Sequence, residues 1–191
     1  MTSDGAQGAR LTNEGAPGAP LFAWWLRPAT AADVPALAAL YTQAALALGP
    51  QVYGAEQVAA WASFGRDLAA FERYVCDAET WLAEDDSRIA LGFCGYSLHA
   101  GLAEVHSLYV RADAGRRGLG RRLLEDGLRR ALGRGAERFE AWATPFSRAL
   151  FAHAGMPLAA AVQGEFKGVM FERYRMAGDA AAVRLRLGGG R

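Results

Sequence analysis

Hydrophobic residues recur along the first part of the chain with spacings that distinguish strands from helices. Residues 21–27 are apolar and aromatic and stop before Pro28, which predicts a first strand. From Thr30 the apolar positions follow a helical spacing, and two shorter helices are predicted over 54–62 and 67–76. The first part of the chain is therefore expected to form one strand followed by a run of helices.

The second part of the chain alternates strand-like and helix-like segments. The predicted strands cover 80–84, 89–98, 102–110, 139–143, 158–162 and 168–176, and the predicted helices cover 119–132 and 147–154. This order predicts an α/β fold, in which a mixed, mostly antiparallel central sheet is flanked by helices as an α-β-α sandwich. With 191 residues, of which 52% are hydrophobic and 21% charged, the chain can form one domain with a sizeable core.

The two ends of the chain differ in composition from the part between them. Residues 1–20 are rich in Gly, Ala, Pro and Ser, and a disordered amino-terminal tail is predicted there. The folded domain is expected over 21–178, followed by a carboxy-terminal tail over 179–191. No signal peptide and no apolar run of about 20 residues is recognised, so we expect a cytoplasmic protein without a membrane segment.

Charge and cysteine content narrow the chemistry further. The formal net charge is +1, so no overall field selects nucleic acid or a membrane surface. Cys76 and Cys94 both lie in apolar surroundings and are interpreted as buried structural thiols. No His, Cys or Asp cluster has metal-ligand spacing, so no metal is expected.

A glycine-bearing turn joins the strand ending at Val110 to the next helix. The glycines at 115, 118 and 120 leave the backbone open to a ligand, and the first amides of a helix lack intrahelical partners. Such a turn can hold a pyrophosphate, and eight arginines surround it: Arg111, Arg116, Arg117, Arg121, Arg122, Arg129, Arg130 and Arg134. A P-loop and a dinucleotide fingerprint both fit the glycine spacing worse. A tight turn without a ligand and a solvated basic helix face remain alternatives.

The segment from Val110 to Arg121 resembles the coenzyme A motif of the GCN5-related N-acetyltransferase (GNAT) superfamily. That motif has Gln or Arg, two residues, Gly, one residue, and Gly or Ala. Gly118 and Gly120 match its glycines, whereas its first position falls on Gly115. Further segments are similar to the superfamily and to its YafP-like bacterial branch: 26–35, 57–61, 80–84, 167–169 and 174–176.

The resemblance implies the superfamily's fold, acetyl-CoA as the acyl donor and a set of coenzyme-binding residues. These residues are Leu108, Tyr109, Val110, Arg116, Arg117, Gly118, Leu119, Gly120, Arg121, Ser147 and Phe151. The strand ending at Val110 is expected to splay from its neighbour and to offer backbone groups to the pantetheine arm. As side chains, Leu108 and Val110 are more simply core residues.

Glu104 and His106 are the candidate catalytic residues. An amine with a pKa near 10.4 is only roughly 0.04 per cent neutral at pH 7, so an acetyl acceptor benefits from a base. Period-two alternation predicts that both side chains share one face of their strand with Leu108 and Val110. We expect His106 to act as base or water-relay partner, with Glu104 as its assistant or as an anchor for the acceptor ammonium. Alternatively, His106 is a hydrogen-bonded sheet residue.

The predicted activity is transfer of acetyl from acetyl-CoA to a primary amine of a small molecule or peptide by direct attack. The tyrosine that often protonates the leaving thiolate in the superfamily corresponds to Phe151. Either the thiolate leaves unassisted, or Ser147, Thr144 or a water helps, or activity is impaired. This departure also allows a non-catalytic acyl-CoA-binding domain on the same fold. A nucleic-acid-binding module is disfavoured because no aromatic platform accompanies the arginines. An exposed closing strand could pair two subunits as a homodimer.

Overall fold

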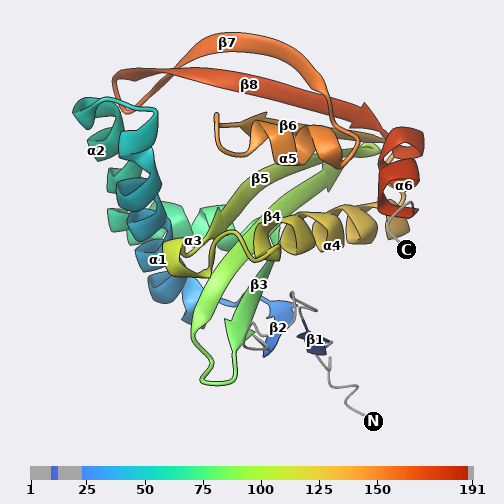
Figure 1. Ribbon diagram of the computed structural model, residues 1–191, viewed down its shortest axis with the longest axis horizontal. Coiled ribbons are helices and arrows are strands. Elements are labelled where there is room, and N and C mark those ends of the chain that lie inside the picture. The colour runs from blue at the N-terminus through green and yellow to red at the C-terminus, as the bar shows by residue number, and fades with distance from the viewer. Residues whose placement is uncertain (1–9, 13–22, 189–191) are drawn as a thin grey trace.

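The computed structural model describes residues 10–12 and 23–188, whose strands form one eight-stranded sheet in the order β1-β2-β3-β4-β5-β6-β8-β7 (Figure 1). The strands are β1 (Arg10–Thr12), β2 (Ala23–Pro28), β3 (Glu79–Asp85), β4 (Ala90–His99), β5 (Leu102–Val110), β6 (Arg138–Ala143), β7 (Leu158–Phe166) and β8 (Val169–Asp179). Strands β5 and β6 pair in parallel and the other neighbours pair antiparallel. The mixed, mostly antiparallel sheet predicted from the sequence is therefore confirmed.

Helices cover both faces of this sheet. They are α1 (Val34–Leu48), α2 (Ala55–Ser63), α3 (Leu68–Cys76), α4 (Leu119–Gly133), α5 (Arg148–His153) and α6 (Ala180–Gly188). Helices α1, α2 and α3 pack on one face, and α4, α5 and α6 pack on the other (Figure 1). This arrangement is the α-β-α sandwich that the order of elements predicts.

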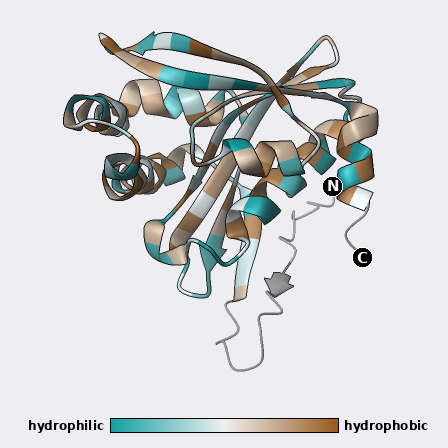
Figure 2. Ribbon diagram, turned by 45° about the horizontal axis from the view of Figure 1, so that its top comes forward, coloured by the Kyte–Doolittle hydropathy of each residue, from teal (hydrophilic) through white to brown (hydrophobic). Residues whose placement is uncertain are grey.

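Each face of the sheet has its own hydrophobic core. On the α4 side, the side chains of Leu123, Leu124 and Leu128 are at most 1% exposed and pack with Phe139. The core on the α1 side is largely aromatic, and Phe71 and Phe93 have no exposed surface there. Figure 2 shows the contrast between hydrophobic positions along the central strands and the hydrophilic turn between β3 and β4. Burial on both faces fixes the register of the strands, because a shift of one residue would exchange the two sets of side chains.

The pairing of β5 with β6 ends before either strand does. The last parallel pair is Val105 with Ala141, whereas β5 continues to Val110 and β6 continues to Ala143. Beyond Val105 the two strands therefore diverge, and the backbone groups of β5 on that side lie outside the ladder. This divergence is the splay that the resemblance implied.

The start of the first helical region is fixed by an ionic network. The Arg27 guanidinium lies 2.7 Å from Asp33 Oδ1 and 2.9 Å from Glu84 Oε2, and the Thr30 amide donates to Asp33 Oδ2. The Arg27 hydrogen bond lowers the pKa of Asp33 from 3.8 to about 2. The network ties the end of β2 to β3 and to the helical region of α1.

The folded part of the chain extends beyond the boundary predicted at residue 178. Strand β8 runs to Asp179 and leads into α6, where Val183 has no exposed surface and belongs to the α4-side core. The glycine-rich end suggested a tail because the short apolar stretch before it was not recognised as a helix. The predicted tail over 1–20 lies mostly outside the described residues, but Arg10–Thr12 forms strand β1, paired with β2.

One helical stretch among the described residues, Ala31–Gln51, is long and apolar enough by its 21 residues and composition to cross a membrane. The sequence analysis recognised no such segment. Leu37 and Ala45 in this stretch have no exposed surface, and they pack in the α1-side core. Packing against the sheet accounts for the apolar character of α1.

Candidate functional site

The beginning of α4 presents backbone amides that have no partner within the helix. Gly118 precedes the helix in a left-handed conformation, with φ of 78°, and its carbonyl accepts the Arg122 amide at 3.0 Å. The three amides of Leu119, Gly120 and Arg121 come before that first helical bond and lack an intrahelical acceptor. A side chain at Gly118 would meet no atom within 4 Å, so the turn is open on that side. Free amides and the helix dipole together suit an anion.

Most arginines around this turn are already bound to acidic side chains. Four ion pairs lie on or beside α4, with nitrogen–oxygen distances of 2.6 to 3.1 Å: Arg111 with Asp113, Arg121 with Glu125, Arg129 with Glu125, and Arg130 with Asp126. Arg116 differs, because it forms no ion pair with any residue that the structure describes. It also lines the cleft described below. Much of the basic stretch is therefore a paired helix face, and Arg116 is its member best placed for a ligand.

A β-bulge at His106 changes which side chains share a face of β5. Val105 pairs with Tyr96 and Ser107 pairs with Gly95, so His106 is an extra residue without an opposite partner. Before the bulge, Glu104 faces the α1 side. The prediction that Leu108 and Val110 share this face is wrong, because both pack against the α4-side core. The extra residue interrupts period-two alternation, which the sequence analysis had assumed to continue.

The splay between β5 and β6 opens a cleft of 610 Å³, called here the splay cleft. Eight predicted site residues line it: His106, Leu108, Tyr109, Val110, Arg116, Gly120, Ser147 and Phe151. Glu104, Arg117, Gly118, Leu119 and Arg121 do not. The Leu119 side chain is 4% exposed and belongs to the core, so only its backbone faces the turn. Eight of the thirteen predicted site residues therefore line one cleft, whereas Glu104 and four residues at the beginning of α4 do not.

His106 is held at the point where the strands separate. Its Nε2 atom lies 2.8 Å from Ser97 Oγ on β4, and its carbonyl accepts a 2.7 Å hydrogen bond from the Tyr74 hydroxyl. The ring is exposed and lines both the splay cleft and the chamber on the α1 side. A base or water relay at this position can reach both spaces.

The opposite wall of the splay cleft carries two hydroxyl groups next to an apolar side chain. Thr144 Oγ1 and Ser147 Oγ lie 3.3 Å apart, and Ser147 Oγ also accepts the Thr144 amide at 3.1 Å. Phe151, one turn further along, is 3% exposed and has no proton to donate. Thr144 and Ser147 are therefore protic side chains that line the same cleft as Phe151.

An aromatic chamber of 360 Å³ lies on the α1 side of the sheet. Its lining residues are Tyr41, Tyr53, Trp61, Phe64, Tyr74, His106, Tyr109, Trp142, Ala143, Thr144, Phe166, Phe171, Glu172 and Arg173. Five of these also line the splay cleft: Trp61, His106, Tyr109, Trp142 and Thr144. The two spaces therefore share a wall, and a group held in the cleft can meet a molecule held in the chamber.

The tyrosines of this chamber are donors rather than ionised groups. Burial raises the pKa of Tyr53 to about 12 and raises the pKa values of Tyr74 and Tyr109 above the ordinary 10.0. Trp61 Nε1 donates to the Tyr109 hydroxyl at 3.4 Å. From the sequence, Tyr109 was predicted to bind the coenzyme only through its backbone. The chamber was missed because its residues come from α1, α2, α3, β5, β6, β7 and β8.

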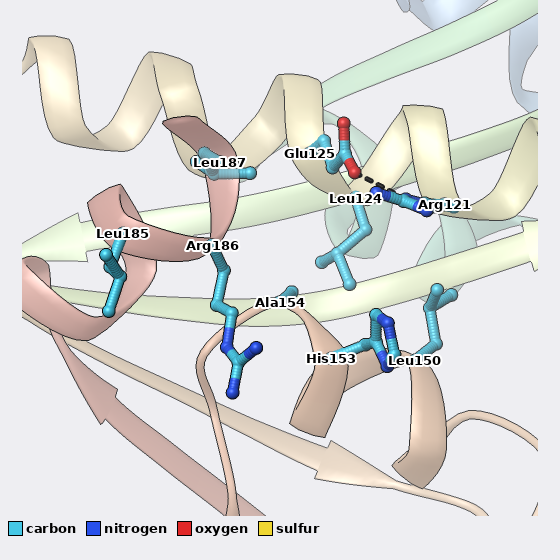
Figure 3. Close-up of a pocket in the computed structure, with 9 residues that line it drawn as sticks. All are labelled: Arg121, Leu124, Glu125, Leu150, His153, Ala154, Leu185, Arg186 and Leu187. Carbon is cyan, nitrogen blue, oxygen red and sulfur yellow. Dashed lines mark hydrogen bonds and ion pairs between the residues drawn. The ribbon is translucent and has the colours of Figure 1, made fainter. Parts of the chain in front are cut away.

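A second hollow of 340 Å³ lies between α4, α5 and α6 (Figure 3). Arg121 from α4, His153 from α5 and Arg186 from α6 all line it, and Leu150 lines both this hollow and the splay cleft. Arg121 is bound to Glu125, as the dashed line in Figure 3 marks. The hollow and the splay cleft therefore border one another at Leu150, and the hollow carries basic groups at its edge.

Neither cysteine lies in these spaces. Cys94 is buried beneath α4, as predicted, but Cys76 is exposed at the end of α3, which corrects the prediction of two buried thiols. Cys76 lies on the helix side turned away from Phe71 and Val75, which form the buried face. Among residues 10–12 and 23–188, no group of three His, Cys, Asp or Glu side chains could hold a metal ion.

Comparisons with known proteins agree with this geometry. The structure of a GCN5-related N-acetyltransferase from Rhodopseudomonas palustris is 25% identical, with a TM-score of 0.74, covering 81% of this chain and 94% of that one. PaiA N-acetyltransferase from Thermoplasma acidophilum, solved with coenzyme A, is 14% identical with a TM-score of 0.67, covering 82% and 98%. YncA from Salmonella typhimurium, solved with acetyl-CoA, is 21% identical with a TM-score of 0.59, covering 81% and 92%.

Sequence comparisons give a complementary result. No curated protein matches the chain at a significant level. The family model described as "Acetyltransferase (GNAT) family" matches residues 49–156, which is more than half of the chain and includes the α4 turn and the splayed strands. The chain therefore belongs to the acetyltransferase (GNAT) family.

Proposed function

We propose that this protein transfers an acetyl group from acetyl-CoA to a primary amine of a small molecule or peptide by direct attack. One observation carries the proposal: the splay cleft runs from Gly120, at the beginning of α4, to His106 and shares a wall with the aromatic chamber. Donor and acceptor can thus approach one another from opposite faces of the sheet. The resemblance to the YafP-like bacterial branch remains a prediction within the GNAT family.

The residues of the cleft fit coenzyme A. The free amides at the beginning of α4 and the Arg116 side chain suit the diphosphate. The Gly120 Cα leaves room beside the turn, since an added Cβ would lie 3.4 Å from Val110 Cγ2 and 3.9 Å from Leu150 Cδ2. The unpaired edge of β5 from His106 to Val110 can bond an extended pantetheine arm. When bound, acetyl-CoA supplies an acetyl thioester, which an amine can attack.

His106 is placed to accept the proton of the acceptor ammonium, directly or through water. Its ring lies at the shared wall, and Ser97 fixes one ring nitrogen at 2.8 Å. Glu104 faces the same side of the sheet but lines neither space. Glu104 is therefore proposed to act through its charge near His106 and not by contact with the acceptor.

The remaining steps use backbone and hydroxyl groups. Amides at the free edge of β5 can stabilise negative charge that develops on the thioester oxygen. The hydroxyls of Thr144 and Ser147 are proposed to assist the leaving thiolate in place of a tyrosine at position 151. Neither cysteine lines the cleft, which supports direct attack over an acyl-cysteine route.

Thiol release from acetyl-CoA, measured against a panel of primary amines, tests this function. Calorimetry with coenzyme A alone supplies an independent measure of donor binding. Turnover with at least one amine is expected, and tight coenzyme binding without turnover of any amine would instead favour a non-catalytic acyl-CoA-binding domain. Absence of coenzyme binding would contradict both.

A further inference from the structure

The wall of the aromatic chamber includes a positively charged side chain, that of Arg173. Arg173 lies on β8, on the same face of that strand as Phe171, and both line the chamber. Among residues 10–12 and 23–188, Arg173 takes part in no ion pair and no hydrogen bond. Its positive charge lowers the pKa values of Tyr53 and Tyr109 against the larger effect of burial, so it acts on hydroxyls inside the chamber. A half-buried guanidinium without an anion costs free energy, which a bound carboxylate would offset.

The nearest acidic side chain of the chamber is already engaged. Glu172 lines the chamber as well, and its carboxylate accepts a hydrogen bond from the Tyr174 hydroxyl. The neighbouring arginine on the strand also differs from Arg173, because Arg175 lies 3.2 Å from Glu140. Of the two arginines on β8, Arg173 is therefore the one without an acidic partner among the residues that the structure describes.

The rest of the chamber is suited to an apolar group. Phe64, Phe166 and Phe171 form one side, where the ring centroids of Phe64 and Phe166 lie 6.1 Å apart and those of Phe166 and Phe171 lie 6.3 Å apart. A 2.8 Å hydrogen bond from Gln57 Nε2 on α2 to the Met170 carbonyl ties α2 to β8 beside Phe171. The volume of 360 Å³ is at the small end of the ~300–1,000 Å³ range of ligand sites. The chamber thus fits a small molecule better than an extended polymer.

We infer that the acetyl acceptor is a free α-amino acid with an aromatic or large apolar side chain, whose carboxylate binds Arg173. This inference rests on the proposed N-acetyltransferase function and narrows its acceptor. The amine would lie at the His106 wall, the carboxylate at Arg173, and the side chain against the phenylalanines. The planar guanidinium matches a carboxylate with two parallel hydrogen bonds. A peptide amino terminus carries a neutral amide where a free amino acid carries its carboxylate, so it could not form this pair.

Matched acceptors test the inference by the presence or absence of the carboxylate. L-phenylalanine, phenylalaninamide and phenethylamine share the ring and the amine, and only the first has the carboxylate. The wild-type kcat/KM is expected to be highest for L-phenylalanine. Replacement of Arg173 by Gln should lower the kcat/KM for L-phenylalanine by about 10- to 100-fold, mainly by raising KM. The kcat/KM for phenethylamine should stay the same. Arg173→Lys should recover part of the loss, because it restores the charge without the fork.

Arg175→Gln is the control for a lost arginine on the same strand, and its selectivity among the three acceptors should equal that of the wild type. Equal wild-type rates with L-phenylalanine and phenethylamine, or an equal loss for both in Arg173→Gln, would overturn the inference. If no amine is acetylated at all, the proposed N-acetyltransferase function fails, and calorimetry then tests the carboxylate site at Arg173 by itself. L-phenylalanine should still bind the wild type and bind Arg173→Gln at least tenfold more weakly, whereas absence of binding would refute the inference.

Discussion

The Nε2 atom of His106 lies 2.8 Å from Ser97 Oγ, at the bulge that interrupts the pairing of β4 with β5. Because the bulge adds one residue to β5, the strand can turn His106 to the α1 face and still bury Leu108 and Val110 on the α4 face. The same residue marks the end of pairing with β6, since the last pair there is Val105 with Ala141. A single local irregularity therefore places the candidate base at the opening between the cleft and the chamber.

Replacement of His106 by Gln should lower kcat with an amine acceptor by about 10²- to 10⁴-fold, which is the usual contribution of a positioned acid or base. Binding of coenzyme A should stay the same, because the α4 amides do not depend on this ring. Steady-state kinetics and calorimetry measure the two effects. Ser97→Ala should have a smaller effect on kcat, since it removes only the group that orients the ring. A full rate in His106→Gln would show that His106 is a structural sheet residue.

Replacement of Gly120 by Glu should abolish measurable binding of coenzyme A. The new side chain would add a negative charge and bulk beside the free amides of α4, where the diphosphate is proposed to lie. Gly120→Ala should retain binding, because its Cβ would make only an ordinary contact at 3.4 Å with Val110 Cγ2. Calorimetry gives the affinity of each variant.

Gly133→Glu at the other end of α4 is the matched control, since a side chain there would meet no atom within 4 Å. It should bind coenzyme A like the wild type. Circular dichroism establishes that each variant is folded. Unchanged affinity in folded Gly120→Glu would remove the α4 turn from the donor site.

Local periodicity was sufficient to predict the main elements of the fold, including the strand and the helix that flank the α4 turn. Strand β5 begins and ends at the predicted residues Leu102 and Val110, and α4 begins at the predicted Leu119. These segments have strong period-two or helical patterns and glycines at their ends. The bulge at His106 was not predictable in the same way, because an extra residue leaves no signature in hydrophobicity alone.

The acceptor side depends on contacts between distant parts of the chain. Tyr53 from the region before α2 and Arg173 from β8 meet in one chamber only after the sheet has formed. Helix α6 was missed for another reason: its single buried residue, Val183, gives almost no amphipathic pattern. The chamber and α6 were both missed because they depend on tertiary packing, which local composition and spacing do not reveal.

The Asp33 carboxylate should contribute to stability in a pH-dependent way. Its pKa is lowered from 3.8 to about 2 in the folded protein, chiefly by the Arg27 hydrogen bond. A lowered folded pKa means that the stabilisation is complete above the unfolded value, near pH 4, and is lost as the pH falls toward 2. Asp33→Asn should therefore lower the free energy of unfolding by about 1–2 kcal/mol at pH 7, a figure reduced for the partial exposure of Arg27.

Chemical denaturation of wild type and Asp33→Asn between pH 7 and pH 2.5 measures this contribution. The difference between them should shrink across the range from pH 4 to pH 2.5. Asp86→Asn, in the exposed turn between β3 and β4, should match the wild type throughout. A difference that stays constant with pH would mean that Asp33 acts through packing or capping and not through its charge.

The two thiols should differ in reactivity, and neither should carry an acetyl group during turnover. Cys76 is exposed, whereas Cys94 is buried and its pKa is raised to about 12 by burial. One thiol of the folded protein should therefore react rapidly with an aromatic disulfide reagent at mildly alkaline pH, and both should react in denaturant. Cys76→Ser should lose the rapid reaction and keep its acetyltransferase rate, because Cys76 lines neither the splay cleft nor the aromatic chamber. Mass spectrometry of the wild type mixed with acetyl-CoA alone should find no acetylated cysteine, and an acetyl-thioester on either residue would refute direct attack.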